Sequence, residues 1–191
     1  MPLRYIILAL AFLVLSCNQP GSQVSTIASG RLAAADSGQQ STTFTSNAGP
    51  ITSINTGKTT PAQLVAFART LTGITYKYGS VNPQEGFDCS GFITYTFNHF
   101  NIAVPRSSKD FTNVKEPTEL KHAKPGDLIL FTGTDSTQKV VGHMGIIVNA
   151  GDSISFIHAT SGKQYGVTET PLNAYYQGRY LKTIRVFPQN H

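Results

Sequence analysis

The sequence is poor in charge and in cysteine: 13% of its 191 residues are charged, and only two are cysteines. So little charge, beside abundant Gly, Ser and Thr, is typical of a secreted or envelope protein rich in β structure. C-x-x-C and H-E-x-x-H spacings are absent, so a zinc site finds no support. The net charge of +5 favours anionic partners, but the lack of a Lys/Arg cluster with interleaved aromatics argues against nucleic acid.

A long hydrophobic run is also missing, because the apolar stretch at residues 5–15 has only 11 residues and is too short to span a bilayer. It follows Arg4 and ends in the tripeptide LSC, which resembles a bacterial lipobox with Cys17 as its cysteine. We therefore expect residues 1–16 to be a lipoprotein signal peptide and Cys17 to carry acyl chains sufficient for stable anchoring. An ordinary signal peptide with an incidental cysteine is the alternative.

The segment after the predicted cleavage site indicates where the protein resides. Asn18 follows the lipidated cysteine, and a residue without acidic charge there favours the outer membrane, facing the periplasm, over the inner membrane. Residues 17–59 are rich in Ser, Thr, Gly, Gln and Ala and carry almost no charge, which predicts a flexible tether. We expect a monomeric domain at residues 60–191 that is held to the cell envelope by this lipid anchor.

Helical patterns precede strand patterns in the expected domain. Thr60 and Pro61 predict the start of a helix that ends by Gly73. The stretch CSGFITYTFNHFN predicts a helix of about three turns that begins at Asp88 or Cys89. Short apolar runs then predict strands at residues 127–131, 143–149, 153–159 and 180–187. Helices first and an antiparallel-type sheet second predict an α+β fold around one core.

Cys89 is a candidate nucleophile because of its place at a helix start. Asp88 is a good N-cap, which puts Cys89 at the first helical position, where the positive helix end favours thiolate over thiol. The negative charge of Asp88 opposes that effect, so the cysteine also needs a base. If Cys17 carries lipid, Cys89 has no intramolecular partner, whereas a Cys17–Cys89 disulfide is the structural alternative.

Two of the five histidines lie in apolar strand segments, His143 in GHMGIIV and His158 in SISFIHA. His99 lies at the far end of the cysteine helix, His122 in a polar loop and His191 at the terminus. Adjacent strands would place His143 beside His158, so that one pairs with the cysteine and the other orients it. Satisfied core histidines and a Cys/His/His zinc site are the alternatives.

The blocks YKYG…GFDCSGFITYTF, VPRSS, KPGDLILF, GHMGIIV and FIHAT together resemble the NlpC family of bacterial cell-wall cysteine peptidases. The resemblance covers about residues 60–187. It implies a papain-like α+β fold and hydrolysis of peptidoglycan stem peptides between γ-D-glutamate and the diamino acid. It also implies that no metal and no organic cofactor is required.

The resemblance assigns roles to individual residues. It implies that Cys89 is the nucleophile, that His143 is the general base and later the acid, and that His158 orients His143. Tyr76 matches the family tyrosine that helps to stabilise the oxyanion, and the backbone N–H of Cys89 would be a second donor.

Four further residues match positions of the family's substrate cleft. Asp88 and Ser90 match positions near the free amine or carboxylate of the stem peptide. Arg106 and Ser107 match a block that lines the cleft, although a purely structural role is equally open for both.

Two other functions share much of this pattern: a thiol amidase or acyltransferase with another envelope substrate, and a non-catalytic wall-binding lipoprotein.

Overall fold

A computed structural model of the protein describes residues 50–191. The predicted signal peptide, the lipidation site Cys17 and most of the predicted tether lie outside the described residues. Within the described range, helices are too short and too polar for any of them to cross a bilayer.

Helices α1 (Pro61–Thr70) and α2 (Cys89–Asn98) come first in the described chain, as predicted, and the short 3-10 helix η1 (Ser108–Asn113) follows. A six-stranded antiparallel sheet makes up the second half, in the order β1-β6-β2-β3-β4-β5. Its strands are β1 (Pro117–Thr118), β2 (Leu128–Thr132), β3 (Val141–Ala150), β4 (Ile154–Thr160), β5 (Gly166–Pro171) and β6 (Tyr180–Ile184). The remaining helical turns are η2 (Leu120–His122), α3 (Ala174–Gln177) and η3 (Pro188–Asn190).

Both long helices begin where their capping residues predict. The Thr60 side chain accepts from the backbone N–H of Gln63, and the Gln63 side chain accepts from the Thr60 N–H, which completes a capping box. Asp88 accepts in the same way from the backbone N–H of Gly91 at the start of α2. These caps satisfy backbone donors that have no partner within the helix, each stabilising the helix by about 1 kcal/mol.

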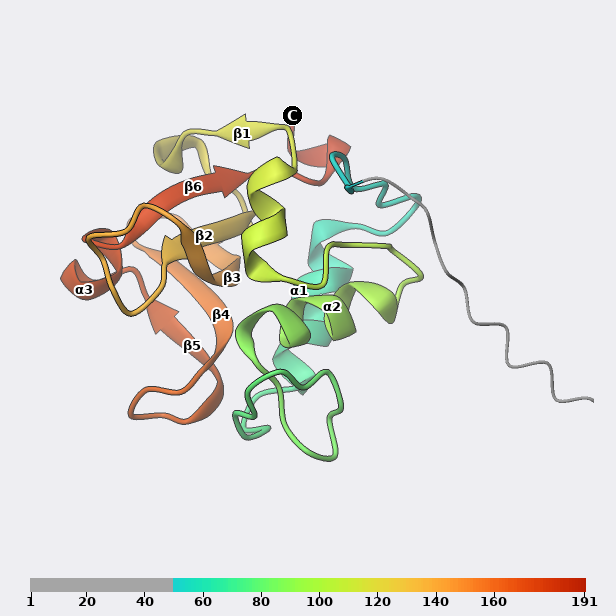
Figure 1. The fold of residues 1–191 in the computed structure, drawn as a ribbon. Helices are drawn as coiled ribbons and strands as arrows, with labels where there is room; N and C mark the ends of the chain where they lie inside the picture. Colours follow the sequence, from blue (N-terminus) through green and yellow to red (C-terminus); the bar gives the residue numbers. More distant parts are fainter. Residues whose placement is uncertain (1–49) are drawn as a thin grey trace, which may run out of the picture. The chain divides into compact units, whose positions relative to one another are not determined.

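The sheet has a different cover on each face. Helices α1 and α2 lie against one face, whereas α3 lies on the other side (Figure 1). Leu128, Leu130 and Ile146 point to the α1–α2 side, while Ile129 and Phe131 point to the α3 side, as alternation along a strand requires. Each fully buried side chain of this size contributes about 2 kcal/mol of hydrophobic stabilisation.

The packed part of the domain starts earlier than residue 60. Ile54 packs against the core, Thr56 is buried, and the backbone N–H of Lys115 donates to the Thr52 carbonyl at 2.8 Å. The segment 50–59, which we assigned to the tether from its composition, therefore lies against the folded domain. Ile51 and Ile54 are each partly buried, a feature of single residues that the composition of the whole segment does not reveal.

The prediction from sequence found β2, β3, β4 and β6 but neither the two-residue β1 nor β5. The β5 sequence GVTETP is mostly polar and half exposed, and it ends in proline, so it lacks the apolar run that marked the other strands. Tertiary pairing creates this strand instead, since all six of its residues align with residues of β4.

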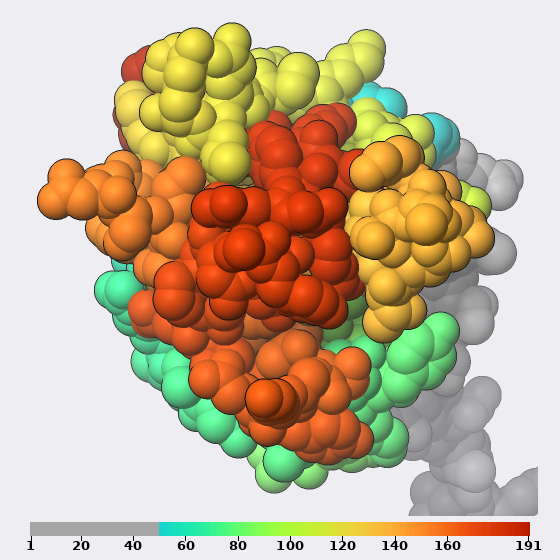
Figure 2. All heavy atoms as spheres, turned by 90° about the vertical axis from the view of Figure 1, so that its left-hand side faces the viewer, coloured from blue at the N-terminus to red at the C-terminus, as the bar shows by residue number. Residues whose placement is uncertain are grey.

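Arg179 lies just before β6 and joins the start of that strand to the end of β2. Its Nη2 donates to the carbonyls of Thr132 and Gly133, each at 2.8 Å, at the start of the β2–β3 loop. Figure 2 shows the α3–β6 segment, in red, directly beside this loop, in gold. The buried guanidinium therefore fixes the loop that leads into β3, the strand that carries His143.

Candidate active site

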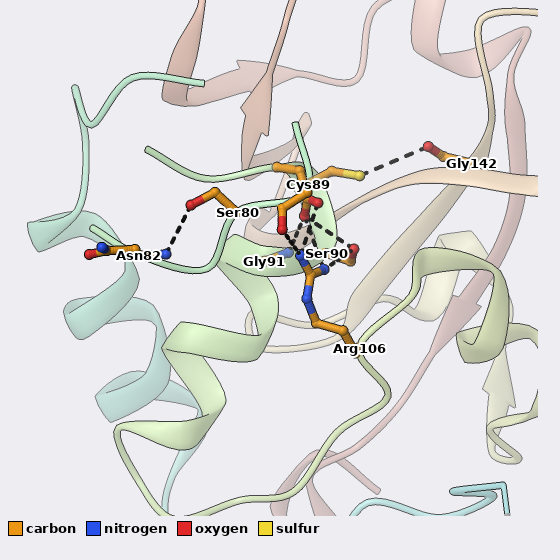
Figure 3. A network of polar contacts seen from close by, with 9 residues as sticks. Ser80, Asn82, Cys89, Ser90, Gly91, Arg106 and Gly142 are labelled. Carbon is orange, nitrogen blue, oxygen red and sulfur yellow. Dashed lines mark hydrogen bonds and ion pairs between the residues drawn. The ribbon is translucent and has the colours of Figure 1, made fainter. Parts of the chain in front are cut away.

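Cys89 occupies the first position of α2, and its thiol lies against the start of β3. The Sγ atom is 3.9 Å from the carbonyl oxygen of Gly142, to which it donates (Figure 3). Burial raises the pKa of Cys89 to about 11, and the nearby charge of Asp88 adds to the rise. The backbone N–H groups of Ser90 and Met144 act in the opposite direction but do not offset it. The resting cysteine is therefore a neutral thiol.

The two main-chain contacts of the thiol bracket His143 in the sequence. Gly142 and Met144 are its neighbours on either side, so the sulfur lies beside the strand segment from which the imidazole extends. Within residues 50–191, no hydrogen bond joins the thiol to the His143 ring, and the thiol donates to the Gly142 carbonyl instead. Catalytic hydrogen bonds are often absent before substrate binds.

The structure brings His143 and His158 together, as predicted. Nε2 of His143 is 2.7 Å from Nδ1 of His158, and Nε2 of His158 is 3.0 Å from Oγ1 of Thr170. The three residues come from β3, β4 and β5, which are consecutive in the sheet. They form a relay that ends in a hydroxyl group, and it leaves Nδ1 of His143 without a partner in the relay.

Both histidines of the relay are neutral at pH 7. Burial lowers the pKa of His143 to about 3, and the positive charge of Arg179 acts in the same direction. The pKa of His158 lies well below its usual range, first through burial and then through the charges of His143 and Arg179. A neutral thiol and a neutral imidazole therefore coexist at rest, rather than a thiolate–imidazolium pair.

Small and aromatic residues shape the space for the two rings. A Cβ at Gly145 would lie 2.7 Å from the Phe156 ring and 3.2 Å from the Cβ of His158, so only glycine fits there. Tyr176 of α3 packs over both rings, with centroids 6.2 Å from His143 and 5.4 Å from His158. The second glycine of GHMG thus lets β3 and β4 approach closely enough for the histidines to meet.

Arg106 forms a charged network with the two residues that flank Cys89 in the sequence. Its Nη2 is 3.1 Å from Oδ2 of Asp88 and 2.9 Å from the Gly79 carbonyl, and its Nη1 is 3.0 Å from Oγ of Ser90 (Figure 3). The Arg106 side chain is 43% exposed, whereas the Asp88 side chain is 12% exposed. The guanidinium therefore joins the residues on either side of the cysteine to the loop before it.

Gly91 allows this loop to rest on the first turn of α2. A Cβ at Gly91 would lie 2.0 Å from the Ser80 carbonyl oxygen, a separation that no side chain can adopt. The backbone N–H of Asp88 donates to the same oxygen at 3.2 Å. The glycine of DCSG is thus required by packing next to the thiol.

Tyr76 and Ser107 differ in their relation to the thiol. Tyr76 is half-buried and forms a β-bridge with Phe87, two residues before Cys89; burial raises its pKa, with further increases from Cys89 and Asp88. Ser107 is exposed at the start of η1, where its side chain caps no helix. The geometry therefore brings Tyr76 to the site but leaves Ser107 outside the Arg106 network.

Sequence reasoning missed two residues of this region, Thr170 and Arg179. The only local signal for Thr170 is the alternation of threonines in GVTETP, which is too weak to reveal a strand. The part of the chain that the structure describes contains no group of three His, Cys, Asp or Glu side chains that could hold a metal ion.

The fold and the site first define a class: a papain-like α+β domain in which a cysteine at a helix N-terminus faces a histidine-bearing strand. The pattern that describes the NlpC/P60 family matches residues 73–185. This chain belongs to the NlpC/P60 family, which confirms the resemblance drawn from its sequence blocks.

Known proteins of the family match only part of this chain, and this chain matches only part of each of them. The gamma-DL-glutamyl hydrolase of Bacillus subtilis (strain 168) is 33% identical over 123 residues, which are 64% of this chain and 29% of that protein. The probable endopeptidase NlpC of Escherichia coli (strain K12) is 33% identical over 116 residues, 60% of this chain and 70% of that protein. A solved NlpC/P60 family structure from Bacillus cereus ATCC 10987 matches with a TM-score of 0.61 at 25% identity, covering 70% of this chain and 42% of that protein.

Proposed function

We propose that the chain is a cysteine endopeptidase that hydrolyses peptidoglycan stem peptides between γ-D-glutamate and the diamino acid. The observation that carries the proposal is the Cys89 thiol at the start of α2, packed against the strand segment that bears His143. Family membership and relatives named as a gamma-DL-glutamyl hydrolase and an endopeptidase support the substrate class.

The first step is attack of the Cys89 sulfur on the γ-carbonyl carbon of D-glutamate. The thiol proton passes to Nδ1 of His143, because Nε2 of that ring is held by His158. With pKa values of about 11 for the thiol and about 3 for the imidazole, free ionisation before attack is unfavourable. The proton therefore moves together with formation of the C–S bond, as general-base catalysis.

The oxyanion forms next to the N-terminus of α2. The backbone N–H of Cys89 is at the first helical position, where no intrahelical acceptor exists, and it can donate to the oxyanion. The Tyr76 hydroxyl is the second donor. His143 then gives its proton to the leaving amine, the C–N bond breaks and a thioester remains.

Water completes the cycle. His143 takes a proton from water as the water oxygen attacks the thioester carbon, the C–S bond breaks and the sulfur recovers its proton. The product is a peptide that ends in a free γ-carboxyl group. In the proposed complex Asp88, Ser90 and Arg106 contact the charged ends of the stem peptide, since the Arg106 side chain is exposed and pairs with Asp88, the residue before Cys89.

The decisive experiment is digestion of purified muropeptides by the full chain and by Cys89→Ala, followed by mass spectrometry of the products. We expect the wild type to split the D-glutamyl–diamino acid bond and Cys89→Ala to yield no product. Hydrolysis retained by the variant would contradict the proposed nucleophile. A folded wild type with a titratable thiol and no cut would favour another amide or ester substrate, or a binding role.

We further propose that Cys17 anchors the protein to the cell envelope, facing the periplasm. The apolar run that ends in LSC supports this proposal. Metabolic labelling with a palmitate analogue should mark the wild-type chain and leave Cys17→Ala unlabelled. An equally labelled Cys17→Ala chain would exclude this lipidation site.

A further inference from the structure

We propose that Thr170 is a positioning residue, which acts through His158 to hold His143 in the tautomer that can accept a proton from the thiol. The inference deepens the proposed function, because it rests on His143 being the general base. Its evidence is the hydroxyl contact of Thr170, 3.0 Å from Nε2 of His158.

The sheet register explains why Thr170 reaches the ring and its neighbour does not. Thr168 is the direct partner of His158, and Thr170 is the partner of Phe156, so all four side chains share one face of β4 and β5. The Thr170 hydroxyl meets His158 diagonally, as cross-strand neighbours can. The Thr168 hydroxyl instead donates to the Glu169 carbonyl at 3.4 Å.

The count of protons permits only two states of the relay. Each ring is neutral and holds one N–H, because burial and the charge of Arg179 oppose a second proton. In the productive state Nε2–H of His143 donates to His158, Nε2–H of His158 donates to Thr170, and Nδ1 of His143 is free to accept. In the reversed state both rings carry the proton on Nδ1, and His143 cannot act as a base.

Thr170 favours the productive state by accepting a hydrogen bond that no other group among residues 50–191 accepts. The His158 side chain is completely buried, so its Nε2–H would be an unpaired donor if the hydroxyl were absent. In the reversed state the same position carries only a lone pair, whose loss of a partner is tolerated better than that of a buried N–H. Removing the hydroxyl thus shifts the relay towards the inactive tautomer.

Other groups around the pair do not supply this acceptor. Arg179 is the charged group that acts on both rings, and it has donors only. Tyr176 packs its aromatic ring against them. The role of terminal acceptor therefore falls to Thr170.

The test compares full-chain Thr170→Val, Thr170→Ser and Thr168→Val with the wild type. Nitrogen-15 NMR of the imidazoles reports the tautomers without any substrate. We expect Nε2–H on both histidines in the wild type and in Thr170→Ser, and a measurable Nδ1–H population in Thr170→Val. Thr168→Val, the matched control on the same face, should keep the wild-type tautomers.

Kinetics on muropeptides supply the second readout. Thr170→Val should lower kcat about tenfold, the size expected for one neutral hydrogen bond, with KM within about twofold, while Thr170→Ser restores kcat. An unchanged tautomer and kcat in Thr170→Val would overturn the inference, and so would an equal loss in Thr168→Val. If Thr170→Val does not fold, a wild-type spectrum with Nδ1–H on His158 still overturns it. If the wild type cleaves no muropeptide, the proposed function fails while NMR still decides the role of Thr170.

Discussion

The candidate site contains two polar networks: one is built from charges next to Cys89, and the other is built from neutral groups that extend from β3, the strand against which the thiol packs. The Arg106 side chain, which is 43% exposed, forms an ion pair with Asp88 and donates to Ser90 and the Gly79 carbonyl. The relay of His143, His158 and Thr170 runs across three strands, and its central ring is completely buried. Charge is tolerated where water reaches it, whereas in the sheet only uncharged rings avoid a large desolvation penalty.

The difference between the two networks explains why the Cys89 thiol is protonated before substrate binds. Burial raises the thiol pKa, the Asp88 carboxylate of the charged network raises it further, and the neutral relay supplies no imidazolium to lower it. Both networks thus keep the sulfur protonated until a substrate carbonyl is attacked. The relay should control the chemical step, whereas the charged network, besides its proposed contacts with the stem peptide, should control stability and the ionisation of the thiol.

The largest effect should follow from breaking the neutral relay at its centre. His158→Leu removes the acceptor for Nε2–H of His143, so kcat should fall about a thousandfold with little change in KM. Steady-state kinetics on muropeptides, beside far-UV circular dichroism to check the fold, measure this change. A folded His158→Leu protein with near-normal kcat would show that His143 needs no partner.

The second-largest effect should be a loss of folding stability at acidic pH. His143 and His158 have folded-state pKa values below their unfolded values, so the unfolded chain binds more protons and stability falls as the pH drops from about 6.5 towards 3. Each histidine should contribute a slope of up to about 1.4 kcal/mol per pH unit. Urea unfolding between pH 7 and pH 5 measures it, and His143→Gln should show a shallower slope. Equal slopes in the two proteins would argue against a buried neutral His143.

Breaking the charged network should have a moderate effect on stability. Arg106→Leu leaves Asp88 without its ion-pair partner, and we expect a loss of about 2 kcal/mol, less than for a fully buried pair because Arg106 is half exposed. Arg106→Lys should be intermediate, since one ammonium group cannot replace the guanidinium fork. Urea midpoints rank the three proteins, and a fully stable Arg106→Leu would mean that solvent compensates for the pair.

The smallest effect tests the coupling of the charged network to the thiol. Asp88→Asn keeps an N-cap but removes a negative charge, so the pKa of Cys89 should fall and iodoacetamide should alkylate it several-fold faster at pH 8. Asp135→Asn is the matched control, because it removes the same charge from the β2–β3 loop. Alkylation rates over a pH series measure the shift, and a rate equal to that of Asp135→Asn would refute the coupling.

Local chemistry in the sequence was sufficient to predict the starts of the two long helices, four of the six strands and the pairing of His143 with His158. Capping at Thr60 and Asp88 depends on groups within three residues, so the pattern is readable from the chain itself. The apolar runs of β2, β3 and β4 indicate buried strands for the same reason. The candidate pair His143 and His158 followed from two such runs with one histidine each.

The tertiary structure alone decided what surrounds those residues. The thiol contacts Gly142, which is 53 positions away, and Arg179 reaches Thr132 across 47 positions. Strand β5 exists only because β4 offers it a paired edge, and Thr170 meets His158 only in that register. Sequence therefore fixes which groups are available and where helices begin, because those interactions are local. Loop closure and sheet register decide which group becomes neutral, buried or paired, because those properties depend on residues far apart in the chain.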